Sequence, residues 1–183
     1  TDYINYEIII INNNSDEQKT ISFLNDLTKK YENIKLINDT SDFNYSKLNN
    51  KAMASSNGDY ICLMNNDIQI VSKNWLSEMM SYALQPEIGA VGTKLLYSNN
   101  VIQHAGVILG IGGIAGHSHK GLDSSQPGYF SRAGVNSEFS AVTAACLVVD
   151  KKKYISVGGL NEKQLKIAFN DVDFCLKLKE KGY

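Results

Sequence analysis

Apolar runs separated by polar stretches predict alternating strands and helices in the first half of the chain. Three short runs, Tyr6–Ile11, Ile34–Ile37 and Tyr60–Met64, are dominated by large or β-branched apolar residues and end in Asn or Asp clusters. Continuous apolar runs bounded by polar residues are typical of strands covered on both faces, as in a parallel sheet. We therefore predict buried strands at these three positions.

Helical spacing of apolar residues separates these strands. A first helix is expected after Ser15, which forms a capping-box pattern with Gln18 three residues later. A second helix is expected from Ser46 to about Ser56, and Ser72 can cap a third helix with one apolar face. Strand–helix–strand units of this kind imply parallel pairing with right-handed crossovers.

The second half of the chain is less regular. The stretch Gly106–Gly121 is rich in glycine and carries His117 and His119, and long irregular segments of compact domains are usually functional or mobile. A His-x-His pair could bind a metal, but two exposed histidines in a flexible loop are the favoured interpretation. The remaining pattern predicts strands at Ile88–Leu96, Val101–Leu109 and Ala141–Val149, and helices at Lys151–Val157 and about Asn170–Lys181.

Composition limits the class of protein. The 183 residues, 43% of them hydrophobic, suit one compact domain over residues 1–183. A formal net charge of −1 provides no general attraction for nucleic acid. No stretch has the length of a membrane-spanning helix, and the first residues do not resemble a signal peptide. Three widely spaced cysteines indicate reduced packing residues in a cytosolic protein.

A polar cluster follows the third predicted strand. Asn65 and Asp67 lie two positions apart, so in an extended backbone their side chains point the same way. Ligands of open α/β sheets gather at the carboxyl ends of strands, where an amide and a carboxylate could hold a divalent cation and the phosphates it bridges. The alternative is a simple turn of Asn and Asp after a buried strand.

Two carboxylates open the predicted last helix. Asp171 and Asp173 are two positions apart, so they point about 200° apart and cannot serve one site together. Asp173 can pair with Lys177, whereas Asp171 shares a protein-facing side with Cys175 and Leu178. Both carboxylates can simply favour the helix start through its dipole. For Asp171, an inward position near the carboxyl edge of the sheet also suits a general base.

Ten short motifs follow one another along the chain. They are Glu7–Ser15, Phe43–Ser46 with Asn49-Asn50, Gly58–Tyr60, Leu63–Asp67, Trp75-Leu76, Gly89–Gly92, Gln103–Gly106, Thr143–Cys146, Gly158–Glu162 and Phe169–Asp173. Their order and spacing resemble the nucleotide-sugar-binding fold of family 2 glycosyltransferases, the GT-A type, over essentially the whole chain. The resemblance implies an α/β, Rossmann-like, mostly parallel mixed sheet flanked by helices. The stretches Gln103–Gly106 and Pro127–Phe130 look most similar to its rhamnosyltransferase-like branch.

The resemblance also implies which residues bind the donor. Asn12 and Asn13 fall where the family usually has acidic residues that recognise the nucleoside, and amides can both donate to and accept from a pyrimidine edge. Asn44 and Asn50 fall in the loop and helix that flank the nucleotide and diphosphate.

The family's Asp-x-Asp metal motif is matched by Asn65-Asn66-Asp67, in which the first acid is replaced. By resemblance, all three residues contact the nucleotide sugar, and Asp67 with Asn65 holds Mg²⁺ or Mn²⁺. Losing one carboxylate should weaken this metal site.

The base of the family is matched by Asp171, although Asn170 stands where Glu is common. His104, Thr143 and Ala144 would then shape the acceptor side. Sugar transfer further requires that Asp67, after the third strand, and Asp171, at the start of the last helix, converge on one cleft, roughly a sugar's width apart.

The reaction implied is transfer of a sugar from a nucleotide-diphosphate sugar to a hydroxyl of a saccharide or lipid-linked saccharide, with inversion at the anomeric carbon. The implied setting is bacterial cell-surface polysaccharide synthesis, in the cytoplasm or at the inner face of the membrane. Peripheral membrane association through a larger parent protein fits this setting, and no nucleic-acid partner is implied.

The resemblance departs from the family at both ends. The family has an additional strand and helix before Tyr6–Ile11 and commonly continues past the last helix, so we expect a GT-A domain that lacks the usual first strand and is a fragment of a larger protein.

Two other functions stay open. A non-catalytic GT-A module that binds a sugar nucleotide or a protein is favoured by Asn12, Asn13 and Asn65. A nucleotidyltransferase would need a glycine-rich phosphate loop, which the chain does not show.

Overall fold

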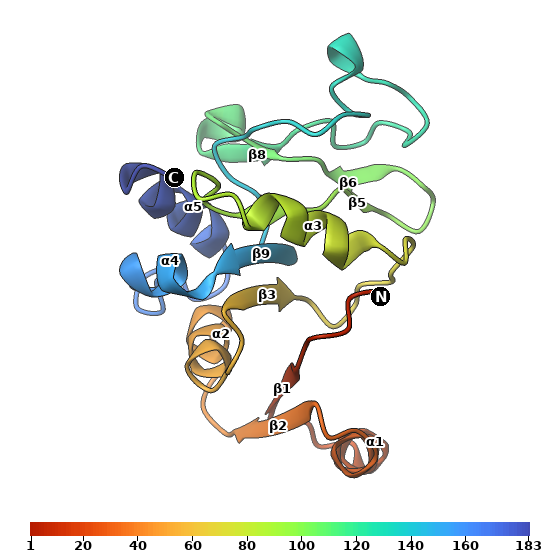
Figure 1. The fold of residues 1–183 in the computed structure, drawn as a ribbon, viewed down its shortest axis with the longest axis vertical. Helices are drawn as coiled ribbons and strands as arrows, with labels where there is room; N and C mark the ends of the chain where they lie inside the picture. The colour runs from red at the N-terminus through yellow and green to blue at the C-terminus, as the bar shows by residue number, and fades with distance from the viewer.

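The computed structural model describes residues 1–183 and has an α/β architecture (Figure 1). Strands β1 (Ile8–Asn13) and β2 (Ile34–Asp39) pair in parallel and are connected by α1 (Gln18–Lys30), which confirms the first predicted strand–helix–strand unit. Asn12 lies opposite Asn38 and Asn13 opposite Asp39, so the polar ends of both strands lie side by side.

The prediction that β1 is fully buried is wrong. Its first residue, Ile8, is 41% exposed, and α1 has no buried residue. The β1–β2 pair forms a separate two-stranded sheet, so neither strand has neighbours on both edges.

A second sheet has the strand order β3-β9-β4. The central strand β9 (Cys146–Asp150) runs antiparallel to both β3 (Tyr60–Met64) and β4 (Val91–Gly92), so β3 and β4 run in the same direction. The partner of β3 is therefore an antiparallel strand, not the parallel neighbour expected. Four of the five residues of β9 are buried, which is why this apolar segment occupies the middle of the sheet.

Two apolar clusters cover the two faces of this sheet. Leu147 and Val149 pack with residues of α2 (Tyr45–Ala54), α4 (Lys151–Ser156) and α5 (Asn170–Glu180). Cys146 and Val148 pack with α3 (Trp75–Ala83). This alternation follows from the two-residue period of a strand. Each fully buried Leu or Val stabilises the fold by about 1.5–3 kcal/mol.

The region between β4 and β9 contains four short strands. β5 (Leu95–Leu96) pairs with β6 (Ile102–His104), and β7 (Val107–Leu109) pairs with β8 (Ala115–His117), both in antiparallel fashion. The glycine-rich stretch is therefore largely a hairpin, β7–β8, with the 3-10 turn η1 (Ile111–Gly113) at its tip. A second 3-10 turn, η2, spans Tyr129–Ser131.

The long strand predicted over residues 101–109 breaks at Gly106. This glycine has φ +99°, and a Cβ there would lie 2.4 Å from the ring of Phe139. A positive φ is accessible to glycine at little cost and interrupts a regular strand. The segment therefore continues as two strands, β6 and β7.

The two predicted serine caps are not formed. α1 begins at Gln18 with Glu17 at the N-cap position, and no side chain caps it. α3 follows Asn74, and the hydroxyl of Ser72 instead donates to the Asn74 side chain (2.6 Å). None of the five α-helices combines the length and apolar content needed to cross a bilayer.

Candidate active site

Asp171 lies in the first turn of α5 and faces the segment that enters β9. Its Oδ2 accepts a hydrogen bond from the backbone N–H of Ala144 (3.2 Å), and its Oδ1 accepts one from the N–H of Val172 (2.9 Å). Asp173 instead lies 3.1 Å from the ammonium group of Lys177. The prediction that the two carboxylates serve different faces is confirmed.

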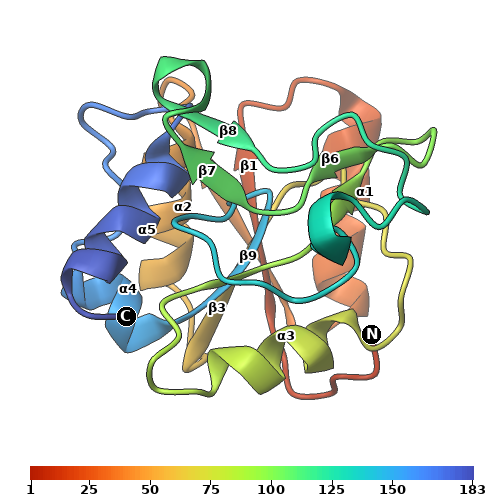
Figure 2. The same cartoon turned by 90° about the horizontal axis from the view of Figure 1, so that it is seen from above.

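The carboxyl end of β3 reaches the same segment. The backbone N–H of Asn65 donates to the carbonyl of Ala145 (2.9 Å), directly next to the residue that binds Asp171. The end of β3 and the start of α5 therefore meet at residues 143–145 through backbone contacts, and the convergence of Asp67 and Asp171 on one cleft stays a prediction. Figure 2 shows α5 beside the β7–β8 hairpin on this side of the molecule.

The side chains that follow β3 are available to a ligand. Asn66 and Asp67 are exposed and Asn65 is half-buried, and no side-chain hydrogen bond ties any of them to the protein. The chain contains no group of three or more His, Cys, Asp or Glu side chains that could hold a metal. One carboxylate and one amide oxygen are hard donors that fit Mg²⁺ or Mn²⁺ only if phosphates or water complete the coordination.

His104 lies behind Thr143 and is fully buried, with 1% of its surface exposed. Its Nε2 lies 3.4 Å from the backbone N of Thr143 and 3.3 Å from that of Gly106. Its Nδ1 lies 2.8 Å from Nδ1 of His117 on β8. Burial, with a smaller contribution from His117, lowers the pKa of His104 to about 4.

The expectation that His117 and His119 are exposed in a flexible loop is wrong. Both are half-buried, and Nδ1 of His119 lies 2.7 Å from the hydroxyl of Ser118. Burial and then the charge of Lys120 lower the pKa of His117, whereas the charge of Asp171 raises it. His117 is therefore a member of the Asp171 region that the sequence did not identify.

Tyr45 is another neighbour of Asp171 that the sequence did not identify. Its hydroxyl donates to the carbonyl of Ala144 (2.9 Å), and burial followed by the charge of Asp171 raises its pKa. The sequence signals were its place within the motif Phe43–Ser46 and directly after the helix cap Asn44. Through this bond, α2 supports the same short segment that Asp171 contacts.

Asn12 and Asn13 join the ends of β1 and β2. The amide of Asn12 donates to Oδ1 of Asn38 (3.0 Å), and that of Asn13 donates to the carbonyls of Asp39 (3.0 Å) and Ser41 (2.8 Å). These amide N–H groups therefore already have partners within the protein. Contact of Asn12 and Asn13 with a nucleoside stays a prediction.

Asn44 and Asn50 tie α2 to a distant loop. The amide of Asn50 donates to the carbonyl of Leu160 (2.9 Å) and the carboxylate of Glu162 (3.1 Å), and its oxygen accepts from Tyr154 (2.6 Å) and the Leu160 N–H (3.0 Å). Asn44 caps α2 and donates to the Glu162 carbonyl (2.9 Å). Both residues position the loop before α5, and a direct ligand contact stays a prediction.

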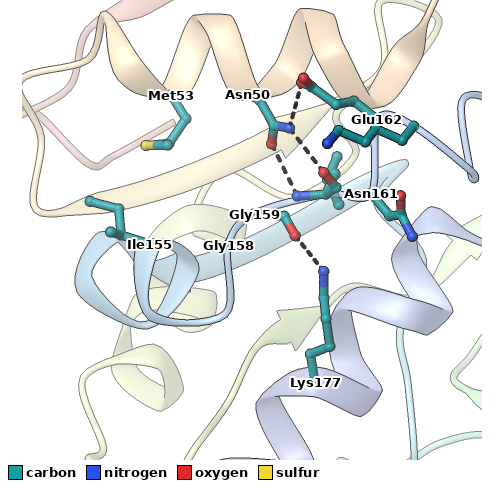
Figure 3. A pocket seen from close by; sticks show the side chains of 10 residues that line it. Asn50, Met53, Ile155, Gly158, Gly159, Asn161, Glu162 and Lys177 are labelled. Carbon is teal, nitrogen blue, oxygen red and sulfur yellow. Dashed lines mark hydrogen bonds between the residues drawn. The ribbon is translucent and has the colours of Figure 1, made fainter.

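Two cavities adjoin this loop. The larger one, about 530 Å³, is shown in Figure 3, where Asn50 forms one side and Lys177 donates to the carbonyl of Gly159 (2.7 Å). The smaller one, about 210 Å³, lies at the start of α2 and is mostly polar. It is lined by Ser41, Asp42, Phe43, Asn44, Lys47 and Lys166.

The fold and the site define a GT-A type of α/β domain. A solved structure, the mannosyltransferase PcManGT from Pyrobaculum calidifontis in complex with GDP-Man and Mn²⁺, matches 97% of this chain and 44% of its own with a TM-score of 0.65. At 12% identity this likeness concerns the fold alone.

Residues 1–126 match the model of glycosyl transferase family 2, and the chain belongs to this family. It is 43% identical to the uncharacterized protein y4gI of Sinorhizobium fredii and 34% identical to the O-antigen biosynthesis protein RfbC of Myxococcus xanthus. All of this chain aligns with each of them, but it spans only 20% and 14% of their respective lengths.

Proposed function

We propose that this chain is the catalytic domain of an inverting glycosyltransferase that moves a sugar from a nucleotide-diphosphate sugar to a saccharide hydroxyl in polysaccharide synthesis. Family membership and the likeness to an O-antigen biosynthesis protein support this class of reaction. The observation that carries the proposal is the meeting of Asp171 and the end of β3 at Ala144 and Ala145.

Asp171 acts as the general base. The N–H groups of Ala144 and Val172 hold its carboxylate in one orientation, and its neighbour Asp173 is directed away to Lys177. Removal of the proton from the attacking hydroxyl contributes about 10²- to 10⁴-fold in rate. A single base with in-line attack inverts the anomeric carbon.

The donor lies between the end of β3 and the start of α2. Lys47 and Lys166 border the smaller cavity, take part in no ion pair of the chain and outnumber its one carboxylate, Asp42, so this edge favours an anionic ligand. Asp67 and Asn65 would hold Mg²⁺ or Mn²⁺, which when bound supplies a Lewis acid for the charge on the departing diphosphate. Within the same proposal, the acceptor is a lipid-linked saccharide at the cytoplasmic side of the membrane, and the sugar transferred is rhamnose.

The test is release of nucleoside diphosphate from a panel of sugar nucleotides by the purified protein, with Mn²⁺ or with EDTA. We expect Asp171→Asn to lower the rate by 10²- to 10⁴-fold. Asp173→Asn is the matched control, since it removes a carboxylate from the opposite face of the same turn and should stay within a few-fold of wild type. Equal activity of Asp171→Asn and wild type would exclude this base, and tight donor binding without any turnover would support the non-catalytic module instead.

A further inference from the structure

The histidine couple His104–His117 has no defined contact with a substrate in the reaction as described so far. His104 on β6 and His117 on β8 come from two different hairpins, and their Nδ1 atoms lie 2.8 Å apart. Their rings meet edge to face, at an interplanar angle of 86°. A short contact between two imidazole nitrogens needs one donor and one acceptor, so the position of each hydrogen can be worked out.

The backbone decides which nitrogen of His104 carries the hydrogen. Nε2 of His104 faces the N–H groups of Gly106 (3.3 Å) and Thr143 (3.4 Å), and a backbone N–H can only donate. Nε2 is therefore an acceptor, and the hydrogen of neutral His104 lies on Nδ1.

This hydrogen in turn fixes the state of His117. Nδ1–H of His104 donates to Nδ1 of His117, which must accept. Neutral His117 then carries its hydrogen on Nε2, on the side of the ring that points away from His104. Because His104 is fully buried and His117 is half-buried, any contact between the couple and a ligand is made by His117.

The histidine couple and the proposed base, Asp171, both contact the same short backbone segment. Thr143 contacts His104 through its N–H, and the next residue, Ala144, contacts Asp171 in the same way. The charge of Asp171 also raises the pKa of His117. Backbone contacts at adjacent residues therefore link the histidine couple to the proposed base.

We propose that His117 donates its Nε2–H to a hydroxyl of the acceptor sugar in front of Asp171, and that His104 is the positioning residue that keeps the hydrogen on Nε2. A neutral N–H donor suits an uncharged sugar hydroxyl rather than a diphosphate, and the comparison of donor hydrolysis with transfer separates an acceptor hydroxyl from a hydroxyl of the donor sugar. The inference rests on the proposed glycosyl transfer and adds a recognition residue to it.

Two substitutions at one position separate the two nitrogens of His117. His117→Asn keeps an oxygen near Nδ1 that can accept from His104 but has no group at Nε2, whereas His117→Gln places an amide N–H near Nε2. The assay uses a sugar nucleotide that the wild type turns over, first with water alone and then with p-nitrophenyl glycosides as acceptor probes. His119→Asn, in the same segment but bonded only to Ser118, is the control and should behave as wild type.

We expect His117→Asn to raise the KM for the acceptor about three- to tenfold, as for one lost hydrogen bond, with donor hydrolysis unchanged. His117→Gln should recover most of this loss. His104→Gln, which keeps an acceptor for the two backbone N–H groups but loses the Nδ1 donor, should raise the same KM, and His104→Asn should rescue it.

An unchanged acceptor KM in His117→Asn, or an equal loss of hydrolysis and transfer, would overturn the inference. If the melting temperature shows that His117→Asn does not fold, His104→Gln and His104→Asn provide the test instead. An unchanged acceptor KM in His104→Gln, or an equal loss of hydrolysis and transfer, would then overturn the inference. If the wild type releases no nucleoside diphosphate from any sugar nucleotide, the proposed function itself fails, and the inference fails with it.

Discussion

Acidification from pH 7 to pH 4 is expected to remove about 3 kcal/mol of unfolding free energy through one side chain, His104. Its pKa falls from 6.5 to about 4 because of burial, so the folded protein keeps this imidazole neutral across that range. The difference of about 2.5 between the two pKa values gives this magnitude at about 1.36 kcal/mol per pKa unit.

The sign follows from proton uptake. Between pH 6.5 and 4 the unfolded chain binds a proton at His104 that the folded chain does not, so unfolding becomes easier as the pH falls. The contribution is complete above pH 6.5 and is lost by about pH 4. Its structural origin is the burial of the imidazole, with a smaller contribution from His117.

The measurement is urea unfolding followed by the fluorescence of Trp75, the only tryptophan of the chain, at steps from pH 7 to pH 4. His104→Gln is the reference, because glutamine does not titrate. The stability of the wild type should fall more steeply than that of the variant, by about 3 kcal/mol over this range. The carboxyl groups with lowered pKa, such as Glu7 and Asp123, are present in both proteins, and so is His117, whose pKa is also lowered. Parallel curves for the two proteins would refute the reasoning.

Two further predictions concern stability. Asn50→Ala leaves the buried hydroxyl of Tyr154 and the N–H of Leu160 without their acceptor, and should cost about 2–6 kcal/mol in urea unfolding at about 1–3 kcal/mol per unpaired group; a loss below about 1 kcal/mol would contradict this. Gly106→Ala forces a side chain into φ +99° and against the ring of Phe139, and should lower the melting temperature by several degrees; an unchanged melting curve would show that the turn relaxes freely.

Sequence patterns predicted those parts of the fold that depend on residues close together in the chain. The helix at residues 170–180 and the separation of Asp171 from Asp173 follow from helical geometry, and both are observed. The parallel pairing of the first two strands follows from a strand–helix–strand pattern and is also observed.

Partners that are far apart in the sequence could not be predicted in this way. The amide of Asn50 is bound by a loop 110 residues away, so its filled hydrogen-bonding capacity has no local signal. His117 contacts His104 only because two hairpins pack together. The central position of β9 in its sheet depends on helices that cover both faces of that sheet. The predicted residues that converge, Asp171, Ala144 and Asn65, do so through contacts of backbone groups that no residue pattern encodes.

The segment Thr143–Ala145 presents its main chain, and not its side chains, to His104, Asp171 and Asn65. Apart from proline, which removes the N–H, no point substitution there deletes these amides and carbonyls, so the residues that the segment accepts are limited mainly by available space. Ala144 is 3% exposed and leaves little such space, so enlarging this side chain should disturb the geometry around the carboxylate without changing a single ionisable group. Such a variant would separate the placement of the base from its basicity.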